Sequence, residues 1–186
     1  AAGCKWRDII IILLIGIIGF TFIAFSKPYI MQRISTFFNP SEDSLGASYQ
    51  IQQSLIAIGS GGFSGRGLGQ SIQKFGFLPE PIGDSIFAVA AEEFGFLGSV
   101  TLIFLFVFFT IQGLRVAREA PDLFGGLVTV GIVILIVSQS FFNIAAMLGI
   151  VPLSGMPLLF VSHGGTALFF TLASVGIVLN VSRHRK

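Results

Sequence analysis

Four apolar stretches, separated by polar segments of unequal length, dominate the pattern along this chain. They cover about residues 9–25, 85–111, 123–148 and 164–181. Each approaches the roughly 20 apolar residues that a helix needs to cross a bilayer. The pattern therefore predicts an all-α fold, a polytopic membrane helix bundle with four transmembrane helices. A large loop, 26–84, lies between the first two and is predicted to contain short amphipathic helices.

Basic residues flank these stretches on one side of a four-span weave: Lys5, Arg7, Arg115, Arg118, Arg183, Arg185 and Lys186. Cytoplasmic loops of membrane proteins carry an excess of Lys and Arg. That side, together with the C-terminus, is therefore predicted to be cytoplasmic. The loop 26–84 is then predicted to be extracytoplasmic.

The long loop carries two patterned segments. Residues 47–59, ASYQIQQSLIAIG, place Ile51, Leu55 and Ile58 on one helical face, which predicts a short amphipathic helix on the membrane surface or against the bundle. Residues 60–71, SGGFSGRGLGQS, contain closely spaced glycines that favour tight turns. No Lys-Ser or Lys-Thr pair follows these glycines, so the segment is not a phosphate-binding P-loop. It is either a plain turn or a ligand contact that includes Arg66.

Asp84 stands at the start of the second apolar stretch. Pro79 and Pro81 prevent a helix from running through the residues before it, and the helix dipole favours an acid at a helix start. Asp84 is therefore a candidate helix cap, a candidate catalyst, or both. Small residues follow it on the same helical face: Ala88, Ala91, Gly95 and Gly98. A second helix is expected to pack closely against such a face.

Polar side chains inside the apolar stretches are costly in hydrocarbon and need partners. Glu92 and Glu93 are adjacent within the second stretch. They form either a buried hydrogen-bonded pair that fixes helix packing or part of a proton or cation pathway. Gln139 and Asn143 share one face of the third stretch, at i and i+4, which predicts hydrogen bonds to a neighbouring helix.

The segment before the fourth stretch, GIVPLSGMPLLFVSHGGTA (149–167), has prolines and glycines that preclude a continuous helix. It is too apolar for an aqueous loop, which predicts a re-entrant or tightly packed segment. Ser162 or His163 is expected to begin the fourth span, so that the N–H groups from Ser162 through Gly164 and Gly165 suit an anion such as pyrophosphate. His163 is either a capping or packing residue or a catalytic base.

Composition narrows the class further. The chain is 53% hydrophobic and 11% charged, whereas a soluble domain has about 25% charged residues. One cysteine and two histidines predict no internal disulfide and no metal site. The net charge of +2 gives no sign of nucleic-acid binding. Because the chain does not begin with Met and opens almost directly into an apolar stretch, it is expected to be part of a larger membrane protein.

Two long segments resemble the SEDS family (shape, elongation, division and sporulation proteins), which polymerise peptidoglycan. They are YQIQQSLIAIGSGGFSGRGLGQSIQKFGFLPEPIGDSIFAVAAEEFGFLG and GMPLLFVSHGGTALFFTLASVGIVLNVSRH. Residues 65–80 look more like the division members than the elongation members. The resemblance covers essentially the whole chain. It implies that residues 1–186 are the C-terminal fragment of one ten-span membrane domain and supply its last four spans.

The resemblance also implies site residues. The essential aspartate of the family lies in a Leu-Pro-Glu-x-x-x-Asp pattern, which Glu80 and Asp84 match. Glu92 and Glu93 match a Glu-Glu pair that follows. This chain departs from the family where Ile82 and Gly83 replace a common His-Thr, and where His163 replaces a frequent Tyr.

The implied function is a peptidoglycan glycosyltransferase of the bacterial cytoplasmic membrane, active in septal cell-wall synthesis, that polymerises lipid II with Asp84 as general base. Undecaprenyl pyrophosphate is the leaving group, and a class B penicillin-binding protein and other divisome membrane proteins are the implied partners. No cofactor is evident, although a divalent cation is compatible with the chemistry. Candidate substrate-binding residues are Glu80, Arg66, Lys74, Ser162, His163, Gly164 and Gly165.

Two alternatives stay open at this stage. A lipid II flippase would use Glu92 and Glu93 in a proton-coupled path. A non-catalytic scaffold of the division machinery would recruit a penicillin-binding protein and carry out no chemistry.

Overall fold

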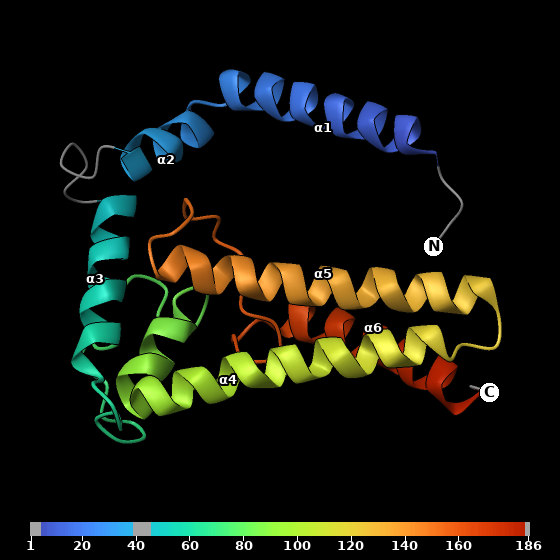
Figure 1. Cartoon of the computed structure of the whole chain (residues 1–186). Helices are drawn as coiled ribbons and strands as arrows, with labels where there is room; N and C mark the ends of the chain where they lie inside the picture. Colours follow the sequence, from blue (N-terminus) through green and yellow to red (C-terminus); the bar gives the residue numbers. More distant parts are fainter. Residues whose placement is uncertain (1–4, 39–45, 185–186) are drawn as a thin grey trace. The chain divides into compact units, whose positions relative to one another are not determined.

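The computed structural model describes residues 5–38 and 46–184 of the chain. It divides into two compact units, Ala1–Ser48 and Tyr49–Lys186. The first unit contains helix α1 (Trp6–Ser26) and helix α2 (Pro28–Phe38), which contact each other (Figure 1). The described side chains of α1 are exposed along its whole length. An apolar helix without a polar face is typical of a membrane span.

Helix α2 lies in the loop 26–84, where short amphipathic helices were predicted but only residues 47–59 were assigned to one. Lys27 has an extended backbone and separates it from α1. Pro28 then occupies the first helical position, where its fixed φ and missing N–H are tolerated. A helix start signalled by one proline in a mixed segment is easily overlooked.

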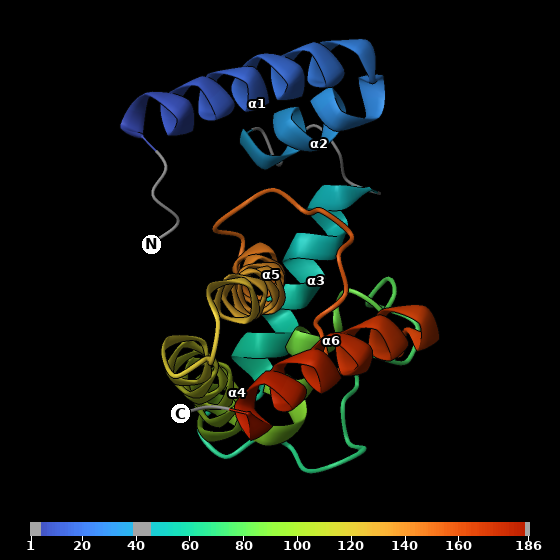
Figure 2. The same cartoon turned by 90° about the vertical axis from the view of Figure 1, so that its right-hand side faces the viewer.

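The second unit contains the remaining helices: α3 (Ala47–Ser60), α4 (Ile86–Arg118), α5 (Leu123–Met147) and α6 (Gly165–Arg183). Helices α4 and α5 run side by side, α6 packs against both, and α3 lies across one end of α4 (Figure 1, Figure 2). The connection from α4 to α5 is short, and Asp122 caps α5 by accepting a hydrogen bond from Gly125 N at 2.9 Å.

The predicted fold class is confirmed. Within residues 5–38 and 46–184 there is no strand, and four helices are long and apolar enough to cross a membrane: α1, α4, α5 and α6. Many of their large apolar side chains are exposed, among them Phe104, Leu135 and Phe169. Such surfaces suit contact with lipid or with further membrane helices.

The prediction of one continuous helix over 85–111 is wrong. Helix α4 is broken at Gly95, whose backbone angles are φ 66° and ψ −162°. Only glycine adopts this combination readily, because it has no Cβ. Figure 1 shows the short first segment turned away from the axis of the long second segment. Glu92 and Glu93 therefore belong to the short segment and not to the long apolar one.

The break frees backbone groups, and the glycine-rich loop pairs with them. Arg66 N donates to Glu92 O and Gly67 N donates to Glu93 O, both at 3.0 Å. On the other side of the break, Phe96 N donates to Gly62 O at 2.9 Å and Leu97 N donates to Phe63 O at 3.2 Å. Unpaired backbone groups are costly away from water, so these bonds stabilise the break. The loop is thus more than a plain turn, because its backbone completes the hydrogen bonding of α4.

The prediction for the small residues of α4 holds at Ala88, which shares a buried cluster with Ala57 of α3, but not at Ala91 and Gly95. A Cβ added to Gly61 would collide with the main-chain oxygen of Ala91, so the loop backbone approaches the helix backbone directly. The face formed by Ala91 and Gly95 receives this loop, where a second helix had been expected.

Helix α3 is present as predicted, but its buried face is different. Ser54 and Ala57 are fully buried, whereas Leu55 is 44% exposed. Ile51 and Ile58 are only partly buried. Small side chains, and not the Ile-Leu-Ile stripe, therefore form the closest contacts of α3 with the rest of the unit.

The close approach at Gly61 predicts the outcome of one substitution. Gly61→Ala should destabilise the protein by about 1–3 kcal/mol, because the new methyl group forces two backbones apart. Thermal unfolding of the detergent-solubilised full-length protein measures the effect. Gly59→Ala is the matched control, since a Cβ at Gly59 meets nothing within 4 Å and should stabilise helix α3 by about 0.4–1 kcal/mol. Equal stability of the two variants would contradict the close approach.

Candidate functional site

The turn at residues 80–85 leads into α4 and presents Asp84. Glu80 adopts a left-handed conformation, with φ 46°. Its carbonyl accepts hydrogen bonds from Gly83 N at 3.0 Å and Ser85 N at 3.3 Å, while its side chain is exposed. In this structure Glu80 therefore shapes the turn through its main chain.

The side chain of Asp84 is partly buried and faces helix α3. Gln50 Nε2 lies 3.2 Å from Asp84 Oδ1 and 2.9 Å from Ser85 Oγ. Ser85 is fully buried, and its hydroxyl donates to Pro79 O at 2.9 Å. Ser85, not Asp84, occupies the cap position of α4 and forms no side-chain capping bond. The interpretation of Asp84 as a helix cap is therefore wrong.

The main chain of this turn is held at three successive carbonyls. His163 N donates to Ile82 O at 2.9 Å. Ser162 Oγ donates to Gly83 O at 2.7 Å, and Asn143 Nδ2 donates to Asp84 O at 2.7 Å. Residues from α5 and from the segment before α6 thus fix the backbone that carries the aspartate.

Asn143 also holds the irregular segment 149–164. Its Nδ2 donates to Met156 O at 2.7 Å, and Gln139 Nε2 lies 3.4 Å from Pro157 O. Leu158 and Leu159 of this segment are buried. The predicted tight packing is observed, but Gln139 and Asn143 bind the carbonyls of this segment where a neighbouring helix had been expected.

The fourth span begins later than predicted. Helix α6 starts at Gly165 with Gly164 at its cap position, so Ser162 and His163 precede the helix. Ser162 Oγ accepts a hydrogen bond from Leu158 N at 2.8 Å. The side chain of His163 is exposed, which contradicts a packing role. Its main chain, and not its imidazole, contributes to the turn around Asp84.

Glu92 is the centre of a second polar cluster. It is fully buried and accepts hydrogen bonds from Ser71 Oγ at 2.6 Å, Ile72 N at 3.1 Å and Gln73 N at 3.2 Å. Arg66 Nε lies 3.5 Å from its Oε1. These contacts fasten residues 66–73 to the first segment of α4.

Glu93 pairs with Lys74, whose Nζ lies 2.6 Å from Oε1. Arg66 and Lys74, two of the candidate substrate-binding residues, are therefore ion-paired within the chain. Each cation faces an anion, so the cluster carries little net charge that could attract a pyrophosphate. Buried pairs of this kind need additional hydrogen bonds to be stable, and Glu92 has them.

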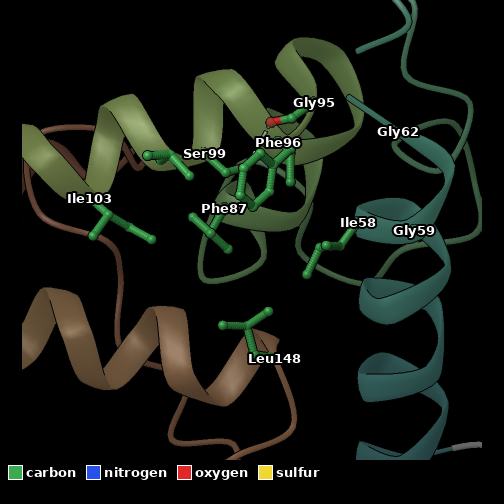
Figure 3. Close-up of a pocket in the computed structure, with 11 residues that line it drawn as sticks. Ile58, Gly59, Gly62, Phe87, Gly95, Phe96, Ser99, Ile103 and Leu148 are labelled. Carbon is green, nitrogen blue, oxygen red and sulfur yellow. Dashed lines mark hydrogen bonds between the residues drawn. The ribbon is translucent and has the colours of Figure 1, made fainter. Parts of the chain in front are cut away.

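An apolar pocket of about 280 Å³ lies between α3, both segments of α4 and the end of α5 (Figure 3). Ile58, Phe87, Phe96, Ile103 and Leu148 are among its lining residues. Phe87 is the second residue of α4 and follows Asp84 by three positions. One residue that lines the apolar pocket therefore lies close in sequence to the turn that carries Asp84.

The structure brings together one group of predicted site residues around the turn: Asp84, Asn143, Ser162 and the main chain of His163. A second group, Arg66, Lys74, Glu92 and Glu93, forms a separate cluster. The first segment of α4 connects the two groups. Gln50 and Ser85 contact the aspartate and were missed. Gln50 was missed because it lies on the same face of α3 as Ser54, at i and i+4. Both residues are polar, whereas the apolar pattern pointed to another face of this helix. No group of three His, Cys, Asp or Glu residues suited to a metal occurs in the described residues.

Fold and site together define a polytopic membrane protein that holds a carboxylate at the start of a broken helix. A family model described as "Cell cycle protein", covering FtsW, RodA and SpoVE, matches residues 1–186, and the chain belongs to this family. The family resemblance inferred from the two motifs is confirmed.

Known relatives cover the whole chain. It is 45% identical over 185 residues to "Stage V sporulation protein E" of Bacillus subtilis, and 42% identical over 186 residues to "Probable peptidoglycan glycosyltransferase FtsW" of Geobacter sp. (strain M18). Each alignment covers 100% of this chain but only 50% and 51% of the relative. The chain therefore spans about half the length of these relatives.

A solved structure agrees with this assignment. It is described as "Structural coordination of polymerization and crosslinking by a peptidoglycan synthase complex". The match has a TM-score of 0.70 at 27% identity and covers 97% of this chain and 50% of the other.

The Glu92 cluster predicts a stability effect. Glu92→Leu should lower the free energy of unfolding by about 2–4 kcal/mol, because one hydroxyl and two backbone N–H groups lose their acceptor in a buried position. Thermal unfolding of the full-length protein in detergent measures it. Glu80→Gln, which changes an exposed acid, should stay within about 0.5 kcal/mol of the wild type. A small loss for Glu92→Leu would show that the loop is held by other contacts.

Proposed function

We propose that the protein containing this chain is a peptidoglycan glycosyltransferase that polymerises lipid II, with Asp84 as the general base. The carrying observation is the position of the Asp84 carboxylate, partly buried at the start of α4 on a backbone held from α5 and from residues 162–163. The printed names of the relatives support the activity. Among the described residues, donors reach only Oδ1 of Asp84, and none reaches Oδ2.

The chemistry assigns a simple role to this carboxylate. The 4-hydroxyl of an incoming lipid II attacks the anomeric carbon of the lipid-linked strand, and a new glycosidic bond forms. The bond to undecaprenyl pyrophosphate breaks, and the hydroxyl proton passes to Asp84 Oδ2. A positioned base of this kind contributes about 10²–10⁴ in rate. An aspartate at the edge of the apolar bundle can meet a sugar whose lipid tail stays in the bilayer.

Arg66 and Lys74 are poor candidates for binding the leaving pyrophosphate, because Glu92 and Glu93 already pair with them. The backbone around Gly164 and Gly165, at the start of α6, stays a candidate for that role. No metal-binding group supports a resident cation in the described residues. A divalent cation that arrives with the pyrophosphate stays compatible with the proposal.

The proposal includes a bacterial cytoplasmic membrane location with the C-terminus inside, which the distribution of Lys and Arg supports. A class B penicillin-binding protein is the proposed partner, since the matched structure is described as a synthase complex that combines polymerisation and crosslinking. Septal synthesis is supported by the relatives named FtsW, although the 45% identity to a sporulation protein is higher than the 42% identity to the FtsW of Geobacter sp. (strain M18).

The flippase alternative finds no support in the contacts of the two glutamates. Both oxygens of Glu92 accept hydrogen bonds and Glu93 binds Lys74, which is the arrangement of a structural clamp. No observation favours a purely structural scaffold over an enzyme.

Replacement of the base tests the proposal. Asp84→Asn in the full-length protein, assayed with its penicillin-binding partner, should lower the rate of lipid II polymerisation by about 10²–10⁴. Asparagine keeps the size of the side chain and an oxygen for Gln50, so the fold should persist. The measurement is glycan strand length and rate on gels with labelled lipid II.

Asp8→Asn, at an exposed aspartate of α1, is the matched control and should keep wild-type polymerisation. Wild-type polymerisation by Asp84→Asn would refute the assignment of the base. Transport of lipid II across vesicles without any polymerisation by the wild type would favour the flippase.

A further inference from the structure

Gln50 is the one side chain among the described residues, apart from the adjacent Ser85, that lies within hydrogen-bond distance of the Asp84 carboxylate. A carboxylate accepts hydrogen bonds only, so the atom of Gln50 that faces it must be the nitrogen. This nitrogen has two hydrogens and two acceptors in reach, Asp84 Oδ1 at 3.2 Å and Ser85 Oγ at 2.9 Å. The amide is therefore used fully as a donor.

The competing donor, Ser85, is already committed elsewhere. Its hydroxyl has one hydrogen and two acceptors in reach, Pro79 O at 2.9 Å and Asp84 Oδ1 at 3.4 Å. The shorter bond is the stronger one, so the hydrogen points to Pro79. Ser85 then presents a lone pair to Gln50, and Gln50 is left as the donor that orients Asp84.

Helix α3 gives Gln50 a firm base that does not depend on its amide. Ser54 and Ala57, one and two turns further along the same face, are fully buried. Ser54 Oγ donates to the main-chain oxygen of Gln50 at 2.8 Å. Loss of the Gln50 amide therefore removes an orienting contact and leaves the packing of α3 in place.

We propose that Gln50 is a positioning residue for the reaction. It holds the Asp84 carboxylate through Oδ1 and so directs Oδ2, to which no described residue donates a hydrogen bond, toward the hydroxyl that is to lose its proton. A neutral amide orients the carboxylate and leaves its negative charge in place, whereas an Arg or Lys would neutralise that charge. The inference rests on the proposed role of Asp84 as the base.

The test uses the full-length protein with its penicillin-binding partner and labelled lipid II. Gln50→Met keeps the length of the side chain and removes the donor. We expect kcat to fall about 10- to 100-fold. This is the range found in metal sites when a residue that orients a metal ligand by a hydrogen bond is lost. KM for lipid II should stay within about twofold, since Gln50 acts on Asp84 and not on substrate. Gln50→His, which places a ring N–H near the same position, should recover part of the rate.

Two controls separate positioning from a structural effect. Gln52→Met changes an exposed glutamine of the same helix and should keep wild-type activity and thermal stability. Gln50→Glu is a second, isosteric variant without the donor and should lose at least as much activity as Gln50→Met. If Gln50→Met fails to fold, the comparison of Gln50→Glu with Gln50→His decides the matter in its place.

The outcomes for Gln50 and for the base are distinguishable. In an Asp84→Asn background, Gln50→Met should cost little further activity, because it acts through the carboxylate that is already absent. The same fold-loss in both backgrounds, or wild-type kcat for Gln50→Met, would overturn the positioning role and leave the base assignment intact. Full activity of Asp84→Asn alone would overturn the base assignment, and the positioning role with it.

Discussion

The break in helix α4 at Gly95 is the constraint on which the rest of this structure depends. A helix interrupted next to apolar surroundings exposes carbonyl and N–H groups that must be paired. The glycine-rich loop supplies these partners with its own backbone on both sides of the break. Glu92 then fastens the following residues of the loop through Ser71 and two backbone N–H groups. Break, loop and buried acid form one unit, and each needs the other two.

The candidate site is built on the other end of the same short segment. Asp84 and the turn before it receive contacts from α3, from α5 and from the segment that precedes α6, at sequence separations of 34, 59 and 79 residues. Most of these contacts hold its backbone and one holds its carboxylate. A rigid backbone with a side chain held at one oxygen is a suitable arrangement for a base, because the second oxygen keeps its lone pairs available to a substrate.

The apolar runs were sufficient to predict the class, the four membrane helices and their approximate bounds. Motif resemblance was sufficient to single out Asp84. The break was not predictable, because a glycine among small residues is just as typical of close helix packing as of a chain reversal. The sequence did not reveal that Arg66 pairs with Glu92 and Lys74 with Glu93. A helical pattern shows which residues share a face of a helix, but not which loop packs against that face. Gln50 was missed because its partner is set by tertiary contact alone.

The break at Gly95 also sets how much of α4 can lie in lipid. An unbroken helix of 33 residues would be about 50 Å long, far beyond the roughly 30 Å of a hydrocarbon core. Residues 96–118 alone give about 35 Å, a close match to that thickness with a modest tilt. The short first segment of α4 is then not needed to span the hydrocarbon core and can fold back at the membrane boundary. Its two glutamates thereby lie among their partners in the loop and do not face lipid, where an unpaired carboxylate would be costly.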